Sequence, residues 1–152
     1  MSASAAVVSK PSVTLQRRIN AAPAKVYAAW TKPDMIVQWF GPNDAKRESV
    51  KAETDVRTGG HFTISFVHGN GELSRVSGAY QEVVPDEKLV FSWAWYTTPD
   101  RVSQVTVTTR ADGDGTLLTL KHEQFFDQAT CDRHARGWTE LLEKLAVQLE
   151  RA

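Results

Sequence analysis

The chain's decisive stretch is DQATCDRHARGWTELLEKLAVQLE, residues 127–150. It contains no proline, and its large apolar side chains recur at spacings of three and four residues, which places them along one stripe of an α-helix. These side chains are Trp138, Leu141, Leu142, Leu145 and Leu149. Asp127 is a suitable N-cap. We therefore predict one long amphipathic helix whose apolar stripe is buried against another part of the chain.

Before this helix, apolar residues alternate with polar ones, which is typical of strands with one buried face. The predicted strands span residues 47–53, 61–67, 73–84, 88–95, 102–110 and 116–123. Turn-forming residues separate them, including Gly59-Gly60, Asn70-Gly71, Pro85-Asp86 and the run from Asp112 to Gly115. Short turns of this kind join antiparallel neighbours, so we predict an antiparallel sheet.

The N-terminal part of the chain contributes one more strand and two short helices. Residues 13–19 alternate as a strand does. Asn20 and Pro23 mark the start of a helix, because proline is tolerated in the first helical turn. A second helix begins at Pro33 and ends before Gly41.

This order of elements predicts the fold class. A sheet of six to seven antiparallel strands twists, and it covers the apolar stripe of one long helix by curving around it. We therefore predict an α+β domain in β-α-α-β6-α order, with the short helices closing one end and an apolar, ligand-sized cavity between sheet and helix. The domain is expected to span residues 12–152, after a disordered arm over residues 1–11.

Composition narrows the range of functions. Eighteen basic residues balance eighteen acidic ones, so no net field attracts nucleic acid or an anionic membrane. No apolar run approaches the ~20 residues that a membrane helix needs. The single cysteine, Cys131, has no partner for an internal disulfide or a thiolate zinc site, which favours a reducing compartment and a cytoplasmic location. The histidines show no metal-binding spacing, so neither a metal nor another cofactor is predicted.

Candidate site residues come from the predicted inward faces of the strands. Phe62, Ile64 and Phe66 share one face, Phe91, Trp93 and Trp95 another, and Val105, Val107, Leu118 and Leu120 continue the pattern. Most of these side chains are expected to form the core, and part of the aromatic set to line the cavity. His122 follows in phase, so its imidazole is expected inside, either as a satisfied structural residue or as a group that orients a ligand or transfers a proton.

Other polar residues are weaker candidates. His61 and His68 are expected at solvent-exposed or rim positions, and His134 off the apolar stripe of the last helix. Strand residues that could reach the cavity mouth are Glu72, Arg75, Tyr80, Tyr96 and Gln104. No Gly-x-Ser-x-Gly elbow is present, and no catalytic constellation is identified. Cys131 is expected to be half-buried and inert.

Several short motifs, taken in order, resemble a known superfamily. They are Ala22 to Trp30, Trp39 to Pro42, Asp55 to Gly60, Gly78 to Tyr80, Val84 to Phe91, Gly115-Thr116, and Gly137-Trp138 followed by Leu141 and Leu145. In this order and spacing they are similar to the START-like (SRPBCC, helix-grip) superfamily, and within it to the activator of heat shock protein 90 ATPase homologue family. The resemblance runs nearly end to end and implies a deep pocket under the long helix.

The resemblance leaves the activity open, because the superfamily includes lipid carriers, hormone receptors, aromatase/cyclases and chaperone cofactors. Our leading hypothesis is binding or carriage of a small hydrophobic or aromatic molecule, in a cavity lined by Trp39, Phe62, Phe66, Phe91, Trp93, His122 and Trp138. The alternatives are a cyclase or aldol-type enzyme acting on a carbonyl substrate in the same cavity, and a module that stimulates a chaperone ATPase. A homodimer stays open as the state of assembly.

Overall fold

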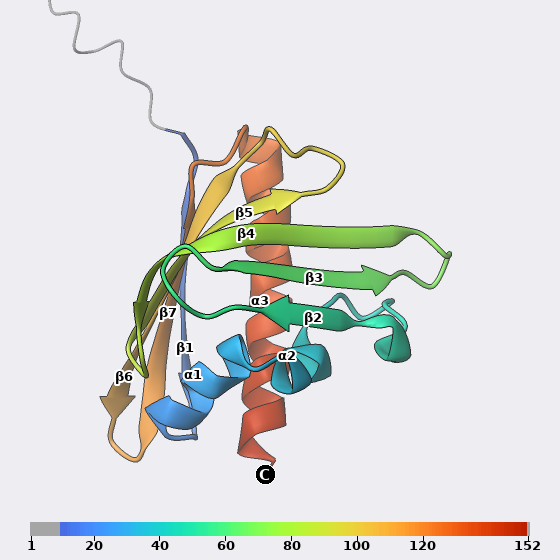
Figure 1. Cartoon of the computed structure of the whole chain (residues 1–152). Helices are drawn as coiled ribbons and strands as arrows, with labels where there is room; N and C mark the ends of the chain where they lie inside the picture. Colours follow the sequence, from blue (N-terminus) through green and yellow to red (C-terminus); the bar gives the residue numbers. More distant parts are fainter. Residues whose placement is uncertain (1–9, 152) are drawn as a thin grey trace, which may run out of the picture.

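The computed structural model describes residues 10–151, and Figure 1 shows their elements around one long helix. In chain order the elements are β1 (Val13–Ile19), α1 (Pro23–Thr31), α2 (Pro33–Trp39), the short 3-10 helix η2 (Arg47–Ser49), β2 (Lys51–Thr54), β3 (His61–Val67), β4 (Leu73–Val84), β5 (Lys88–Trp95), β6 (Ser103–Asp112), β7 (Gly115–Glu123) and α3 (Gln128–Glu150). The predicted arm, residues 1–11, lies outside the described residues except for Lys10 and Pro11. The α+β class and the β-α-α-β6-α order are confirmed.

All seven strands form one antiparallel sheet in the order β1-β7-β6-β5-β4-β3-β2. The sheet is irregular where β4 pairs with β5, because the register shifts between Tyr80 and Glu82. Gly78 lies near this irregularity, and a Cβ atom on it would come within 1.8 Å of the carbonyl oxygen of Ser92. Glycine is required for such a close approach. Beyond this point β2, β3 and β4 run across α3, as Figure 1 shows.

α3 lies against one face of the curved sheet (Figure 1). Its start is capped by Asp127, whose carboxylate accepts the backbone N–H of Thr130 at 2.8 Å. Its buried side chains are Cys131, Trp138, Leu142, Leu145, Ala146 and Leu149. The predicted amphipathic helix is therefore confirmed. Neither α3 nor any other helix in the described part of the chain is both long and apolar enough to cross a bilayer.

The two short helices cover one end of the space between the sheet and α3. Each begins with a proline at its first position, as predicted. The indole N–H of Trp39 on α2 donates to the carbonyl of Ala29 on α1 at 3.0 Å, which joins the two helices. After α2, the carbonyl of Gly41 accepts a hydrogen bond from Lys144 Nζ on α3 at 2.7 Å. The two short helices thereby add a third wall at this end, made of Trp30, Ile36 and Trp39.

The predicted strand over residues 47–53 is wrong at its start, where η2 lies instead. The hydroxyl of Ser49 donates to the carbonyl of Lys46 at 2.6 Å and accepts the backbone N–H of Val67 at 2.9 Å. A side chain therefore satisfies the backbone groups that a strand ladder would have used. Pairing of β2 with β3 begins at Lys51.

Candidate functional site

Aromatic rings fill the space between the sheet and α3 where α1 and α2 cover it. The rings of Phe62 and Phe91 pack edge-on with centroids 5.2 Å apart, and Trp93 lies 5.2 Å from Trp138. The space left here, which we call the inner void, has a volume of about 20 Å³, enough for about one water molecule. Its lining residues are Trp30, Ile36, Trp39, Phe40, Thr54, Phe62, Ile64, Tyr80, Phe91, Trp93 and Trp138. The enclosed interior is therefore much smaller than the ligand-sized cavity that the sequence predicted.

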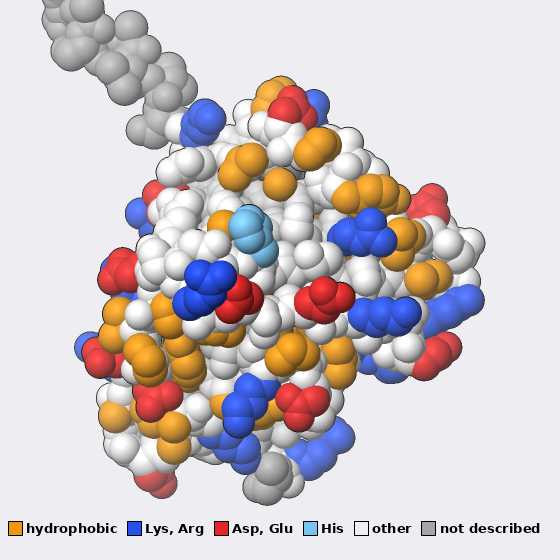
Figure 2. Space-filling view, in the orientation of Figure 1, with side chains coloured by type: hydrophobic (Ala, Val, Ile, Leu, Met, Phe, Trp, Pro, Cys, Tyr) orange, Lys and Arg blue, Asp and Glu red, His pale blue; other side chains and the backbone are white. Residues whose placement is uncertain are grey.

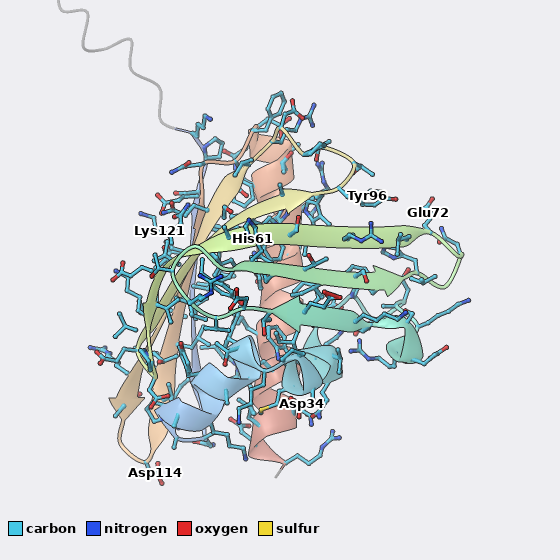
Figure 3. The ribbon with its side chains drawn as sticks, in the orientation of Figure 1. Asp34, His61, Glu72, Tyr96, Asp114 and Lys121 are labelled. Carbon is cyan, nitrogen blue, oxygen red and sulfur yellow. The ribbon has the colours of Figure 1, made fainter. Side chains whose placement is uncertain are left out.

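A larger space opens at the other end of the same aromatic layer. This space, which we call the aromatic groove, has a volume of about 500 Å³ and lies between α3 and the ends of β3, β4 and β5. Its lining residues are Phe40, Gly41, Pro42, Phe66, His68, Glu72, Leu73, Ser74, Trp93, Trp95, Tyr96, Thr97, Arg133, His134, Gly137, Trp138, Glu140 and Leu141. Figure 3 labels Glu72 and Tyr96, which lie on this side of the molecule. The volume falls in the range of ~300 to 1,000 Å³ that is usual for small-molecule sites.

The seven residues predicted to line the cavity separate into four groups. Phe66 lines the aromatic groove. Three of the seven, Trp39, Phe62 and Phe91, line the inner void. Trp93 and Trp138 line both spaces, and Phe40, which the sequence analysis did not select, also lines both. His122 lines neither space.

His122 is instead a fully buried structural residue with both ring nitrogens occupied. Its Nδ1 accepts the indole N–H of Trp138 at 2.9 Å. The proton therefore resides on Nε2, which donates to the hydroxyl of Ser103 at 2.7 Å. The Ser103 hydroxyl in turn lies 3.3 Å from the carbonyl of Trp93 and donates to it. Burial, and secondarily the nearby His134, lowers the pKa of His122 to about 2, so this imidazole is held neutral.

His134 belongs to the aromatic groove, and the prediction that it lies off the stripe of the last helix is wrong. Its Nε2 accepts the indole N–H of Trp95 at 3.0 Å, and its Nδ1 donates to the carbonyl of Thr130 at 2.8 Å. Burial lowers its pKa, while the bond to Thr130 opposes that shift. The spacing contained the signal for this position, because His134 precedes Trp138 by four residues and so shares its helix face.

The other two histidines occupy the predicted kinds of position. His61, which is labelled in Figure 3, is the first residue of β3 and is exposed. His68 lies at the edge of the aromatic groove, where its Nδ1 is 3.1 Å from the carboxylate of Asp44 and its Nε2 is 2.9 Å from the hydroxyl of Ser74. Among the groove-lining histidines of residues 10–151, His68 is the one in contact with a carboxylate.

The remaining polar candidates do not converge on one point. Glu72 and Tyr96 line the groove, Tyr80 lines the inner void, and Arg75 is exposed on β4. Burial raises the pKa of the Tyr80 phenol, so this group stays neutral. The fifth candidate, Gln104, lines neither space, and its side-chain amide donates a hydrogen bond to the carboxylate of Glu123.

Within the range 10–151, no group of three or more histidine, cysteine, aspartate or glutamate side chains is placed to hold a metal ion. Cys131 is fully buried, not half-buried as predicted, and burial raises the pKa of its thiol. A thiol in such an apolar environment is a poor nucleophile.

Known structures with the same architecture cover nearly the whole chain. The protein CV1439 from Chromobacterium violaceum superimposes with a TM-score of 0.80 at 24% identity, covering 91% of this chain and 97% of that one. The AHSA1 protein SPO3351 from Silicibacter pomeroyi gives 0.76 at 26% identity, with coverage of 91% and 97%. CalU16 from Micromonospora echinospora gives 0.67 at 26% identity, with coverage of 90% and 74%. No curated protein matches this chain.

A family model supplies the sequence counterpart of these structural likenesses. The model described as "Activator of Hsp90 ATPase homolog 1-like protein" matches residues 20–150, from the end of β1 to the end of α3. The matched range includes both short helices, six of the seven strands and every residue that lines the inner void or the groove. The chain therefore belongs to the family of activator of Hsp90 ATPase homolog 1-like proteins, within the START-like superfamily that its sequence resembles.

Proposed function

We propose that this protein binds a small hydrophobic or aromatic molecule in the aromatic groove. One observation carries the proposal: a space of about 500 Å³ is bordered by the rings of Phe66, Trp93, Trp95, Tyr96 and Trp138. Aromatic walls with a few polar groups are typical of small-molecule sites. The groove is also open to solvent at Tyr96, a large apolar residue with 46% exposure, so a ligand can enter without unfolding of the core.

The energetics of such binding are adequate. Burying ~300 Å² of apolar surface contributes ~7 kcal/mol at ~25 cal/mol per Å². Part of this gain is offset by the lost freedom of the ligand, so burial of this area alone is enough for weak binding. Charged side chains of both signs are mixed over the face shown in Figure 2, in agreement with the balanced composition. The surface therefore supplies no strong general attraction for one sign of charge.

The hydrogen bonds of His122 and His134 disfavour acid–base catalysis by either imidazole. His122 and His134 each accept an indole N–H on one nitrogen and donate from the other, so neither has a free site for a substrate proton. Lowered pKa values keep both neutral near pH 7. General acid–base catalysis needs a group that can exchange a proton with the substrate.

The cysteine is buried, which fits a reducing compartment, and we propose a cytoplasmic location on that basis.

Gly137 offers a direct way to test the proposal. It lies on the groove side of α3, and a Cβ atom on it would meet nothing within 4 Å. Gly137→Leu therefore adds a side chain at the groove whose Cβ atom meets no neighbour, and leucine is a good helix former. Tryptophan fluorescence and thermal shift with a panel of aromatic ligands should show binding to the unaltered protein and at least tenfold weaker binding to this variant.

Two variants serve as controls for this experiment. Gly137→Ala adds one methyl group at the same position and should retain binding. Thr139→Leu introduces the same side chain at an exposed α3 position that does not line the groove, and it should also retain binding. Absence of any response from a broad panel, or undiminished binding to Gly137→Leu, would overturn the proposal.

A further inference from the structure

The hydrogen bonds of the five tryptophans divide them into two classes. Three indole N–H groups have protein acceptors: Trp39 donates to the Ala29 carbonyl at 3.0 Å, Trp95 to His134 at 3.0 Å and Trp138 to His122 at 2.9 Å. The indole N–H groups of Trp30 and Trp93 are buried and have no acceptor among the described residues. Both residues are more than nine-tenths buried, with exposures of 7% and 4%.

The two unpartnered donors belong to the same site. Trp30, on α1, and Trp93, on β5, both line the inner void. The ring of Trp138 neighbours each of them, with its centroid 5.8 Å from that of Trp30 and 5.2 Å from that of Trp93. Segments that are far apart in the sequence thus bring two indole rings with unpartnered N–H groups to the lining of one small space.

A buried donor without an acceptor is unfavourable, and native proteins seldom contain two together. The cost falls when an acceptor atom enters the space. The residues that line the inner void include no charged side chain, so a carboxylate or an ammonium group would lose its hydration without gaining an ionic partner. The group that fits is a neutral oxygen atom that accepts hydrogen bonds and has no O–H hydrogen to donate.

The inner void is also adjacent to the aromatic groove. Phe40, Trp93 and Trp138 line both spaces, so they form the partition between them. A planar ligand lying in the groove against these rings could extend one oxygen past the partition. The volume of about 20 Å³ accommodates an atom of that size but not a ring.

We propose that the inner void is the polar end of the binding site and receives the carbonyl oxygen of a neutral aromatic ketone or quinone, hydrogen-bonded by the indole N–H of Trp30 or Trp93. This inference rests on the proposed function and specifies its ligand class. The aromatic groove holds the ring system, and the inner void distinguishes a carbonyl compound from the corresponding hydrocarbon.

The test uses a matched pair of probes, fluorenone and fluorene, which share three fused rings and differ in a carbonyl against a methylene group. Titration followed by tryptophan fluorescence should show fluorenone binding about tenfold more tightly, as expected for one hydrogen bond to a buried donor. Trp30→Phe and Trp93→Phe keep a ring and remove the N–H, and at least one of them should reduce this preference severalfold. Trp95→Phe, which alters the groove but not the inner void, should change both affinities alike and leave their ratio intact.

A spectroscopic measurement on the unaltered protein guards against variants that fail to fold. The carbonyl stretch of bound fluorenone should move to lower frequency in the infrared, and the indole N–H resonance of Trp30 or Trp93 should shift downfield with fluorenone but not with fluorene. Equal affinities and an unshifted carbonyl stretch would overturn the inference while leaving the groove as a binding site. Binding of neither probe, nor of any other aromatic ligand, would overturn the proposed function itself.

Discussion

The inner void and the aromatic groove are two parts of one aromatic layer, yet they differ in volume by more than an order of magnitude. The layer is walled by the sheet and α3 in both places. At the inner void, α1 and α2 add Trp30, Ile36 and Trp39 as a third wall, and the rings interlock to leave about 20 Å³. At the groove, the residues opposite the sheet include Gly137 and Leu141 of α3, and about 500 Å³ is open. The comparison shows that covering helices and side-chain size, more than sheet curvature, determine where this fold has room for a ligand.

Removing the partition between the two spaces should have the largest effect. Trp138→Ala deletes a ring that lines both, and loss of a buried indole should lower the free energy of unfolding by ~3 to 5 kcal/mol. The change also leaves Nδ1 of His122 without its donor. Urea unfolding measures the loss. Trp138→Phe retains most of the ring and should cost less, and a variant Trp138→Ala as stable as the parent would show that α3 does not pack as described.

Acidification should have the next largest effect, because it lowers the free energy of unfolding of the whole fold. The pKa of His122 is about 2 in the folded protein against 6.5 in the unfolded chain, so the unfolded chain binds the proton first as the pH falls. The free energy of unfolding is therefore highest above pH 6.5, and it declines by up to ~1.4 kcal/mol per pH unit below that value. The lowered pKa of His134 acts in the same direction.

Urea unfolding at a series of pH values between 7.5 and 4.5 checks this dependence, with a loss of roughly 3 kcal/mol expected over the range. His122→Gln should be less stable at neutral pH but should show a shallower decline, because it removes the titrating group. A stability that is constant across this interval would contradict the assignment of His122 as a buried neutral residue.

The smallest effect is expected from a methyl group at the groove. Gly137→Ala should raise the free energy of unfolding by ~0.5 to 1 kcal/mol, because alanine is the better helix former and its Cβ atom meets nothing within 4 Å. Thermal unfolding is a suitable measurement. The opposite result is expected at Gly78, where the Cβ atom of an alanine would collide with the carbonyl of Ser92. Destabilisation by both substitutions would mean that α3 is packed more tightly at the groove than the structure shows.

Sequence periodicity predicted the elements well because it reports local geometry. The stripe that contains Trp138 and Leu145 identified α3, and Asp127 identified its first turn. The strand predicted to begin at residue 47 is replaced at its start by η2, and this too has a local cause. The Ser49 hydroxyl accepts the backbone N–H of Val67 in place of a strand hydrogen bond, and periodicity does not detect such a contact. His134 was misplaced although its spacing from Trp138 assigned it to the same helix face.

The amino-acid sequence by itself determined the order of the elements, the curved sheet around one helix and the supply of aromatic rings between them, because these follow from periods of two and of three to four along neighbouring residues. The tertiary structure decided which rings fill space and which border it, why His122 is a bonded structural residue, and why Trp30 and Trp93 keep free donors. The physical reason is that free volume is a small difference between the size of the fold and the summed size of its side chains. That difference depends on how α1, β5 and α3 meet in space, and no short stretch of sequence contains it.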